Sequence, residues 1–275
     1  VVPHCAVFDT AWHRSSPEQA YRYAVREVWY GDHGVRRYGF HGTSFAYRSC
    51  RAAALLDRDL VDTNLILFHV GNGASANAVQ AGRSIDTSMG MTPLEGLVMG
   101  TRSGDIDPAI GPAMMRWEGL DPAELDRILN KQSGLAGLAD GASDRRVLMR
   151  MANDGHAGAR LALDLETYRL RKYLGAYLAV LGRADAVVFS GGAGEMSPTL
   201  RHGALHDLEV LGIHLDDDRN SLAVTRDAET RISTDDSPVP ILVIPTDEER
   251  VMAEDTAAIL AGREPGALPY SFERV

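Results

Sequence analysis

The chain has 275 residues, of which 45% are hydrophobic, and its formal net charge at pH 7 is −10. This length allows one large domain or two smaller ones with a sizeable core. An acidic chain without a basic stripe argues against nucleic acid as the main partner, and an anionic substrate would need a metal ion or a few arginines to receive it.

The cysteines and the hydropathy pattern indicate a reduced, non-membrane setting. The two cysteines, Cys5 and Cys50, are far apart and lack metal-ligand spacing, so no disulfide framework is predicted and a cytosolic location is favoured. No apolar run reaches the ~18 residues of a membrane span, and no signal peptide is visible. The chain begins at Val1, without methionine and in a strand-like run, so we expect that the N-terminal part of a longer protein is missing.

The first part of the chain predicts a strand followed by two helices. Residues 5–8 are typical of a short buried strand that ends at Asp9. Ser16 and Pro17 indicate a capped helix start, because serine is a good cap and proline suits the first helical position. A second helix is predicted from Ser44.

Residues 65–79 predict a β-hairpin whose tip has the composition of an anion site. Asn72-Gly73 is the commonest two-residue hairpin turn signal. Such a turn needs neither Gly71 nor His69, and the N–H groups of a glycine-rich turn can hold a phosphate that approaches the main chain. An ordinary hairpin is the alternative interpretation.

The second part of the chain alternates helices and strands, which favours an α/β fold. Residues 80–120 are rich in Gly, Pro, Thr and Ser, a composition typical of binding loops. The remaining predicted elements, in chain order, are a helix capped by Asp121, a long helix over 157–181, a buried strand over 186–190, a glycine loop over 191–194, a helix from Ser197 to Gly212, a strand over 241–244, and a final helix capped by Thr246 and ended by Gly262.

Three single residues are candidates for ligand binding or catalysis. Asp9 lies at the carboxyl end of a predicted strand, where α/β sheets bind ligands, although it could simply cap or turn the chain. His41 precedes a helix N-terminus, where an anion is favoured, and the alternative is a neutral core histidine. Arg102, in a glycine-rich loop, could reach a transferring phosphoryl group or pair with Asp105.

Two later motifs are candidates for nucleotide and metal contacts. Residues 187–197 combine a strand, a glycine turn and a helix, but Ser197 replaces the third glycine of a dinucleotide fingerprint, which disfavours a dehydrogenase. Glu248 follows a strand, where one carboxylate can hold Mg²⁺ together with waters and phosphates. It could instead complement the helix dipole with Asp247, and Glu249 could complete a capping box with Thr246.

Read in order, several stretches closely resemble acetate kinase. They are VFDTAWH, RRYGFHGTS, HVGNGAS, SIDTSMGMTPLEGLVMGTRSGDIDPAI, ILNKQSGLAGL, GGAGE and VIPTDEE. The resemblance runs from about residue 1 to 260, and the block 84–110 is highly specific. It implies an α/β fold of the sugar kinase, Hsp70 and actin superfamily (ribonuclease H-like), with two related domains around ATP and the first domain largely missing.

The resemblance also implies a division of the chain and an activity. Residues 1–11 would be a remnant of the N-terminal domain, 12–247 the C-terminal nucleotide-binding domain, 248–262 a terminal helix packing on the N-terminal domain, and 263–275 a tail. Acetate kinases transfer the γ-phosphoryl group of ATP to acetate reversibly with Mg²⁺, or Mn²⁺ in its place. They are cytoplasmic homodimers, so acetate, ATP and a second copy are the expected partners, with no nucleic acid and no membrane.

Site roles follow from the matching motifs. The resemblance implies that Asp9 lies beside the substrate, that His41 and Arg102 stabilise the transition state, and that Glu248 is the Mg²⁺ ligand. The ATP contacts that it implies are His69, Val70, Gly71, Asn72, Gly73, Asp144, Arg145, Arg146, Gly192, Ala193, Gly194, Glu195 and Met196.

The sequence departs from the family pattern at several places. The N-terminal strand with its Asn-x-Gly-Ser-Ser-Ser loop is absent, and Met196 and Asp247 replace asparagines. Two alternatives therefore stay open beside acetate kinase. One is a propionate or butyrate kinase of the same fold, because one methylene is worth only ~1–3 kcal/mol of discrimination. The other is an inactive remnant that only binds nucleotide or dimerises.

Overall fold

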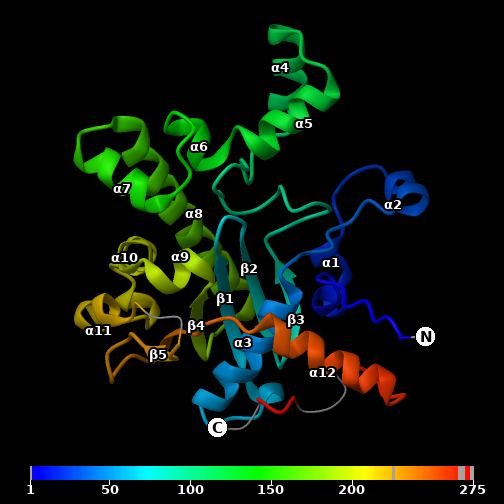
Figure 1. The fold of residues 1–275 in the computed structure, drawn as a ribbon, viewed down its shortest axis with the longest axis vertical. Helices are drawn as coiled ribbons and strands as arrows, with labels where there is room; N and C mark the ends of the chain where they lie inside the picture. The colour runs from blue at the N-terminus through cyan, green and yellow to red at the C-terminus, as the bar shows by residue number, and fades with distance from the viewer. Residues whose placement is uncertain (1, 225–226, 266–269, 273–275) are drawn as a thin grey trace.

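The sheet at the centre of the molecule is mixed and lies between helices (Figure 1). The structure, a computed structural model, describes residues 2–224, 227–265 and 270–272. In that part of the chain the strand order is β3-β2-β1-β4-β6-β5, with β1, β4 and β6 parallel and the other pairs antiparallel. The strands are β1 (Asn64–Val70), β2 (Ala74–Gln80), β3 (Arg83–Thr87), β4 (Ala186–Ser190), β5 (Thr230–Arg231) and β6 (Ile241–Val243).

Because side chains alternate along β1, the two faces of the sheet pack against different helices. Consecutive side chains of a strand point to opposite faces. Leu65 and Leu67 pack in one core with Phe45 of α3 (Gly42–Leu55), whereas Ile66 and Phe68 lie in the other core. That second core includes apolar residues of α8 (Ala157–Leu181) and α10 (Pro198–Leu205). A mixed sheet with parallel central strands and helices on both faces is the architecture expected of an α/β protein, so the predicted α/β class is confirmed.

The other helices surround this three-layer core. In Figure 1, α4 and α5 extend away from the sheet at the top of the view, and α12 lies beside α3. Every helix in the described residues is too short or too polar to cross a bilayer. The other helices are η1 (Ala11–Ser15), α1 (Glu18–Tyr21), α2 (Glu27–His33), η2 (Leu60–Asp62), α4 (Ile110–Glu118), α5 (Pro122–Lys131), α6 (Gly134–Leu138), α7 (Arg145–Asn153), α9 (Gly191–Met196), η3 (Glu209–Leu211), α11 (Asp217–Leu222) and α12 (Glu248–Leu260).

Several predicted elements are confirmed. The hairpin, the long helix over 157–181 and the strand over 186–190 are present as β1–β2, α8 and β4. The helix capped by Asp121 is α5, in which Asp121 accepts from the Glu124 N–H at 2.8 Å and Glu124 returns a bond of 2.8 Å to the Asp121 N–H. These elements depend on local periodicity and caps, which sequence displays directly.

The predicted strand over residues 5–8 is wrong. This segment has no ladder partner among the described residues, and Phe8 is 69% exposed. A strand requires a neighbour for its N–H and C=O groups, so a strand-like composition alone is insufficient. The two-residue turn is also wrong, because Val70 pairs with Ala74 and the loop has three residues, closed by a bond of 2.8 Å from the Gly71 N–H to the Gly73 carbonyl.

Several predicted helix boundaries differ from those observed. The helix predicted from Ser16 splits into α1 and α2, and the serine side chain caps neither. The predicted glycine loop over 191–194 is the first turn of α9, and the helix predicted to end at Gly212 ends at Leu205. Asp247 rather than Thr246 caps α12, because the Thr246 hydroxyl bonds to Ser44 at 2.9 Å.

The final helix packs within this chain. Val251 of α12 is buried with Cys50 of α3 and with Phe272. The predicted docking of residues 248–262 on an N-terminal domain therefore remains a prediction, and so do the other domain boundaries.

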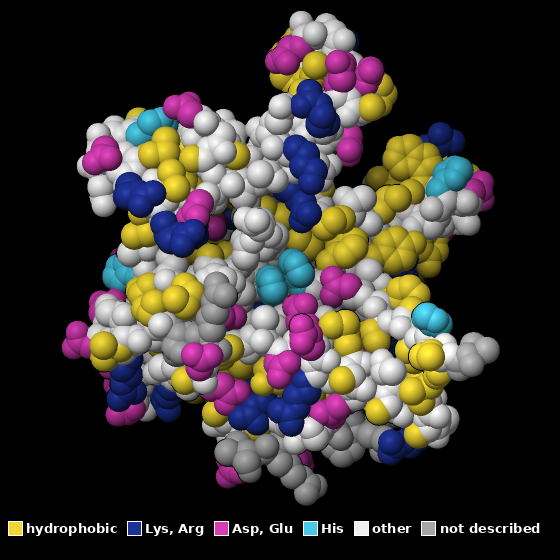
Figure 2. All heavy atoms as spheres, viewed as in Figure 1, with side chains coloured by type: hydrophobic (Ala, Val, Ile, Leu, Met, Phe, Trp, Pro, Cys, Tyr) yellow, Lys and Arg dark blue, Asp and Glu magenta, His cyan; other side chains and the backbone are white. Residues whose placement is uncertain are grey.

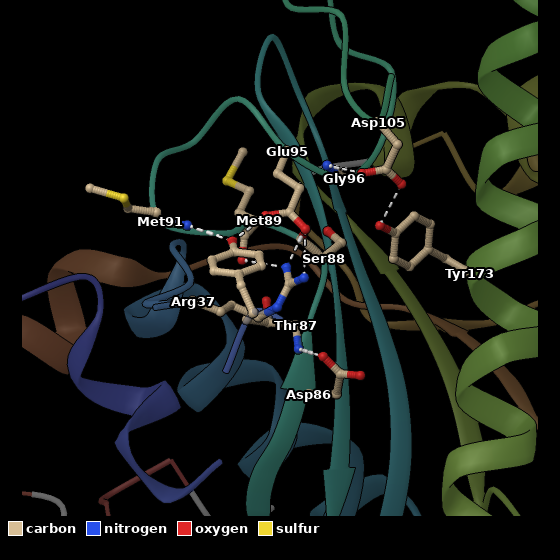
Figure 3. A network of polar contacts seen from close by, with 11 residues as sticks. Arg37, Asp86, Thr87, Ser88, Met89, Met91, Glu95, Gly96, Asp105 and Tyr173 are labelled. Carbon is tan, nitrogen blue, oxygen red and sulfur yellow. Dashed lines mark hydrogen bonds and ion pairs between the residues drawn. The ribbon is translucent and has the colours of Figure 1, made fainter. Parts of the chain in front are cut away.

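A polar network fixes the start of the long loop between β3 and α4 (Figure 3). Arg37 donates to the Ser88 carbonyl at 2.9 Å, to the Met89 carbonyl at 3.0 Å and to Glu95 Oε1 at 2.6 Å. The Tyr23 hydroxyl bonds to the other oxygen of Glu95. The stretch from Ser88 to Glu95 is thereby attached at both ends to the guanidinium of Arg37.

The end of the same loop is held by a second carboxylate in this view. Asp105 accepts from the Gly96 N–H at 2.8 Å and from the Tyr173 hydroxyl at 2.8 Å. Since Tyr173 belongs to α8, the stretch that carries Arg102 is tied to the main helical layer.

We predict that Glu95→Gln lowers the free energy of unfolding by about 1.5–3 kcal/mol, because the charge-assisted bonds to Arg37 and Tyr23 are weakened in a largely buried place. Urea titration measures this difference. The matched control is Glu18→Gln, which removes an exposed partner of Arg22 and should change the free energy of unfolding by less than about 1 kcal/mol. Equal losses in the two variants would contradict a special role for Glu95.

Candidate active site

The candidate site lies where the parallel strands end. Gly71 follows β1, Gly191 follows β4 and Ile244 follows β6, and the parallel pairing of these strands brings the three positions to one edge of the sheet. Ligands of α/β sheets bind at this edge, beyond the carboxyl ends of the strands. The hairpin tip, residues 71–73, projects from it.

Two stacked histidines lie beside the tip. The rings of His41 and His69 have centroids 4.1 Å apart. His41 has a left-handed backbone (φ 58°) at the N-cap of α3, and its N–H donates to Asp9 Oδ2 at 2.7 Å. A Cβ on Gly42 would lie 2.2 Å from the Asp9 carbonyl oxygen, so only glycine allows the adjoining bond from the Gly42 N–H to that carbonyl. This contact brings Asp9 to the site.

Both histidine rings are neutral at pH 7. Burial lowers the pKa of His41 to about 4 and overrides the opposing charge of Asp9. Burial and the charge of Arg48 hold the pKa of His69 well below its usual range. His41 Nδ1 and the Ser75 hydroxyl share a hydrogen bond of 2.7 Å. Each ring can therefore give one N–H to a ligand without carrying a charge.

Arg102 approaches the tip where Gly73 has no side chain. A Cβ on Gly73 would lie 3.4 Å from Arg102 Nη1 and 3.5 Å from His41 Nε2. The Gly100 N–H donates to the Asn72 carbonyl at 3.1 Å, which joins the Arg102 loop to the tip directly. These contacts bring His41, Arg102 and the bare backbone of residues 71–73 together.

The alternative ion pair between Arg102 and Asp105 is wrong. Asp105 is used by Gly96 and Tyr173, as described above. Arg102 Nη1 contacts only the Pro93 carbonyl at 3.4 Å and the Met99 sulfur at 3.7 Å, and within the described residues it has no carboxylate partner. Its charge is therefore available to an anion.

The start of α6 supports the Arg102 loop from behind. Gly134 has φ +63°, and a Cβ there would lie 2.2 Å from the Met99 carbonyl oxygen and 2.5 Å from that of Arg102. This absence of a side chain lets the Leu135 N–H reach the Met99 carbonyl at 2.9 Å. The loop that carries the Arg102 guanidinium is thus held by backbone contacts with the hairpin tip on one side and with α6 on the other.

The predicted adenosine segment, residues 192–196, forms most of α9. Gly191 has φ +78°, and a Cβ there would lie 2.8 Å from the Val70 carbonyl oxygen, so the segment packs directly on the end of β1. Glu195 is buried and accepts from the Gly191 N–H at 2.9 Å. Gly192 and Met196 are exposed and face solvent. Glu195 is thus a structural residue of α9, whereas Gly192 and Met196 are open to a ligand.

Glu248 lies with His69 at a second hollow of the same edge. A pocket of ≈ 430 Å³ is lined by His69, Gly191, Gly192, Glu195, Pro245, Thr246 and Glu248. The described residues contain no cluster of three or more His, Cys, Asp or Glu side chains that could enclose a metal. Mg²⁺ is commonly held by one or two carboxylates with substrate phosphates, so a single half-buried Glu248 fits that ion.

The predicted ribose and adenine segment, residues 144–146, begins α7. A Cβ built on Gly100 would lie 3.5 Å from the Ser143 Cβ, so this helix starts beside the Arg102 loop. Asp144 caps the helix by accepting from the Arg146 N–H at 2.8 Å. Arg145 instead forms an ion pair with the buried Glu166 of α8, and burial lowers the pKa of Arg145 to about 10. Asp144 and Arg146 are exposed here.

Sequence reasoning missed four polar residues behind the site. Ser75 holds His41, and Ser44, Arg48 and Thr246 form a hydrogen-bonded group around His69. The available signal was the spacing of Arg48, which lies four residues after Ser44 and three after the buried Phe45 and therefore faces the same interior as both.

The face shown in Figure 2 presents these charges together. Histidine side chains lie near the centre of the view, with basic side chains above them and acidic side chains below. A patch with this charge pattern, next to exposed backbone N–H groups, is suited to a phosphate chain and a divalent cation.

Comparisons with known proteins identify the family of the chain. The model of the acetokinase family matches residues 1–254. An acetate kinase of Trichlorobacter lovleyi is 55% identical over 271 residues, which cover 98% of this chain and 64% of that protein.

Solved structures show the same fold. The acetate kinase of Porphyromonas gingivalis superimposes with a TM-score of 0.90 at 45% identity, over 92% of this chain and 63% of that one. A propionate kinase from Francisella tularensis gives 0.82 at 42% identity, over 88% and 61%. The chain therefore spans less than two thirds of the length of these relatives. The predicted fold class is confirmed, and the chain belongs to the acetokinase family.

Proposed function

We propose that the protein transfers the γ-phosphoryl group of ATP to the carboxylate of acetate, reversibly and with Mg²⁺. The observation that carries this proposal is the convergence of Arg102 and neutral His41 on the bare backbone of Gly73. Fixed donors around a glycine tip suit a transition state whose charge is spread over equatorial phosphoryl oxygens.

The chemistry needs positioning more than acid–base catalysis. A carboxylic acid with a pKa near 4–5 is already an anion at pH 7, so acetate requires no general base. The N–H groups of Asn72 and Gly73 would hold the phosphates. Arg102 and His41 would each donate to an oxygen of the moving group. Asp9 orients His41 through its bond to the His41 N–H, and its carboxylate would lie beside the substrate. Catalysis would come from in-line placement and charge stabilisation.

The nucleotide and the metal would use the other end of the same edge. Gly192, Met196 and Arg146 would contact adenosine. Arg145 supports α7 through its ion pair with Glu166. Glu248 would hold Mg²⁺, or Mn²⁺, which when bound neutralises part of the charge on the phosphates. By its family the protein would be a cytoplasmic homodimer.

A propionate kinase is the second candidate, because a protein of that name superimposes with a TM-score of 0.82. Relative kcat/KM for acetate, propionate and butyrate separates the two, with a preference of about 10–200-fold expected for one methylene. Trapping the acyl phosphate with hydroxylamine tests the activity itself. Nucleotide binding without trapped product would favour the inactive remnant.

We predict that Arg102→Ala lowers kcat/KM by about 10²–10³-fold, or ~2.7–4 kcal/mol, because a fixed cation is removed from the transition state. The control is Arg58→Ala. Arg58 pairs with Asp185 at the opposite end of the sheet, so activity should be preserved. An Arg102 variant with unchanged kcat/KM would exclude this residue from the mechanism.

We also predict that Glu248→Gln weakens the apparent affinity for Mg²⁺ by about tenfold or more, ~1.4 kcal/mol, while the KM for acetate changes less. Titration of activity against Mg²⁺ at saturating ATP measures both quantities. Glu249→Gln is the matched control, since Glu249 is the exposed neighbour on the same helix. Parallel changes in both constants would count against a metal role for Glu248.

A further inference from the structure

Arg48 is a buried cation without a carboxylate partner. Its side chain is 0% exposed, and within the described part of the chain no acidic group lies at ion-pair distance. Burial lowers its pKa to about 9, so the guanidinium still carries its charge at pH 7. Such burial is unfavourable unless hydrogen bonds satisfy the group.

The hydrogen bonds of Arg48 converge on one side of His69. Arg48 Nε donates to the Ser44 carbonyl at 2.8 Å, Nη1 to the Phe68 carbonyl at 3.4 Å, and Nη2 lies 3.2 Å from His69 Nδ1. Nη2 also bonds to the Ser44 hydroxyl. This arrangement follows from strand alternation, since His69 points to the same face of the sheet as Leu65 and Leu67, where α3 packs.

The contact with Arg48 determines which nitrogen of His69 carries the proton. A guanidinium has only donors, so the nitrogen that faces it must offer a lone pair. A neutral imidazole with Nδ1 as acceptor carries its proton on Nε2. The Ser44 hydroxyl, 3.0 Å from the same Nδ1, can donate to that nitrogen or to Thr246 without changing this assignment.

The protonated nitrogen faces the hairpin tip. A Cβ built on Gly71 would lie 3.7 Å from His69 Nε2, and His69 lines the hollow that contains Glu248. The N–H of His69 is therefore directed to the place where a phosphate chain would lie.

We propose that Arg48 is a positioning residue that fixes His69 as its Nε2–H tautomer, so that the ring donates a hydrogen bond to a phosphate oxygen of a nucleoside polyphosphate. The phosphate part rests on the proposed function, whereas the tautomer does not. If Arg48 merely joined α3 to β1, its loss would reduce stability without acting through His69.

The first test is the tautomer itself. Protein labelled with ¹⁵N-histidine gives long-range ¹H–¹⁵N spectra that distinguish the two ring nitrogens, and His69→Asn assigns the signal. We expect Nε2–H in the unmodified protein and in Arg48→Lys, which retains a donor, but a mixture of tautomers in Arg48→Met. An Nδ1–H form in the unmodified protein, or an unchanged spectrum in Arg48→Met, would overturn the proposal.

The second test is a double-mutant cycle on ADP affinity, measured by calorimetric titration. Arg48→Met and His69→Asn should each weaken binding about tenfold, and the double variant should lose little more, because both changes remove one interaction. Additive losses would overturn the positioning role. Ala52→Gly, a change at a fully buried position of the same helix, controls for destabilisation and should leave the tautomer intact.

Failure of the wider proposal is separable. If the unmodified protein did not bind ADP, the proposed function and the phosphate contact would both fall, while the spectra would still decide the tautomer. If Arg48→Met did not fold, Arg48→Lys would carry the test. Lysine keeps a donor for His69 Nδ1, although at a longer distance than arginine, so the ADP affinity of this variant should stay within a few-fold of the unmodified value. A loss as large as that of His69→Asn would contradict the proposal.

Discussion

The site depends on the close approach of Arg102 and His41 to the backbone of Gly73. A Cβ on Gly73 would already lie in van der Waals contact with both groups, 3.4 Å from the guanidinium and 3.5 Å from the His41 ring, so a side chain there would occupy the space between them. Three segments meet here: α3 brings His41, the loop after β3 brings Arg102, and β1–β2 brings the tip. The bond from Gly100 to Asn72 locks two of them together. A displacement of any one of these segments would misalign the N–H donors of Arg102 and His41, which can stabilise a transition state only when they are correctly placed.

The positive charge of the site resides in arginines, although the chain as a whole is acidic, with a formal charge of −10. The charges of Arg48 and Arg102 add to burial in lowering the pKa of His41, and the charge of Arg48 does the same for His69. Neutral rings can donate to a phosphate while Arg48, whose pKa of about 9 lies above 7, keeps its charge. The electrostatic character of the site therefore changes little around neutral pH.

How far the sequence predicts this molecule depends on what fixes each element. Helix α8 and strand β4 follow from local periodicity, and the motifs of residues 36–44, 69–73 and 84–110 indicated most of the site. The errors occur where a distant partner decides the outcome. Residues 5–8 lack a neighbouring strand, and Thr246 is taken from its capping role by Ser44. Arg48 was missed because an arginine in a helix normally indicates a surface position.

Asp9 links the first residues of the chain to this arrangement. Its carboxylate accepts from the His41 N–H at 2.7 Å, and its carbonyl accepts from Gly42. If the charge of Asp9 controlled the ring, His41 would be protonated, but burial and the nearby arginines prevail and its pKa falls to about 4. Asp9 therefore acts on the backbone of His41, holding its left-handed conformation so that the ring lies over His69. Through Asp9, the first described residues of the chain thus contribute to the geometry of the candidate site.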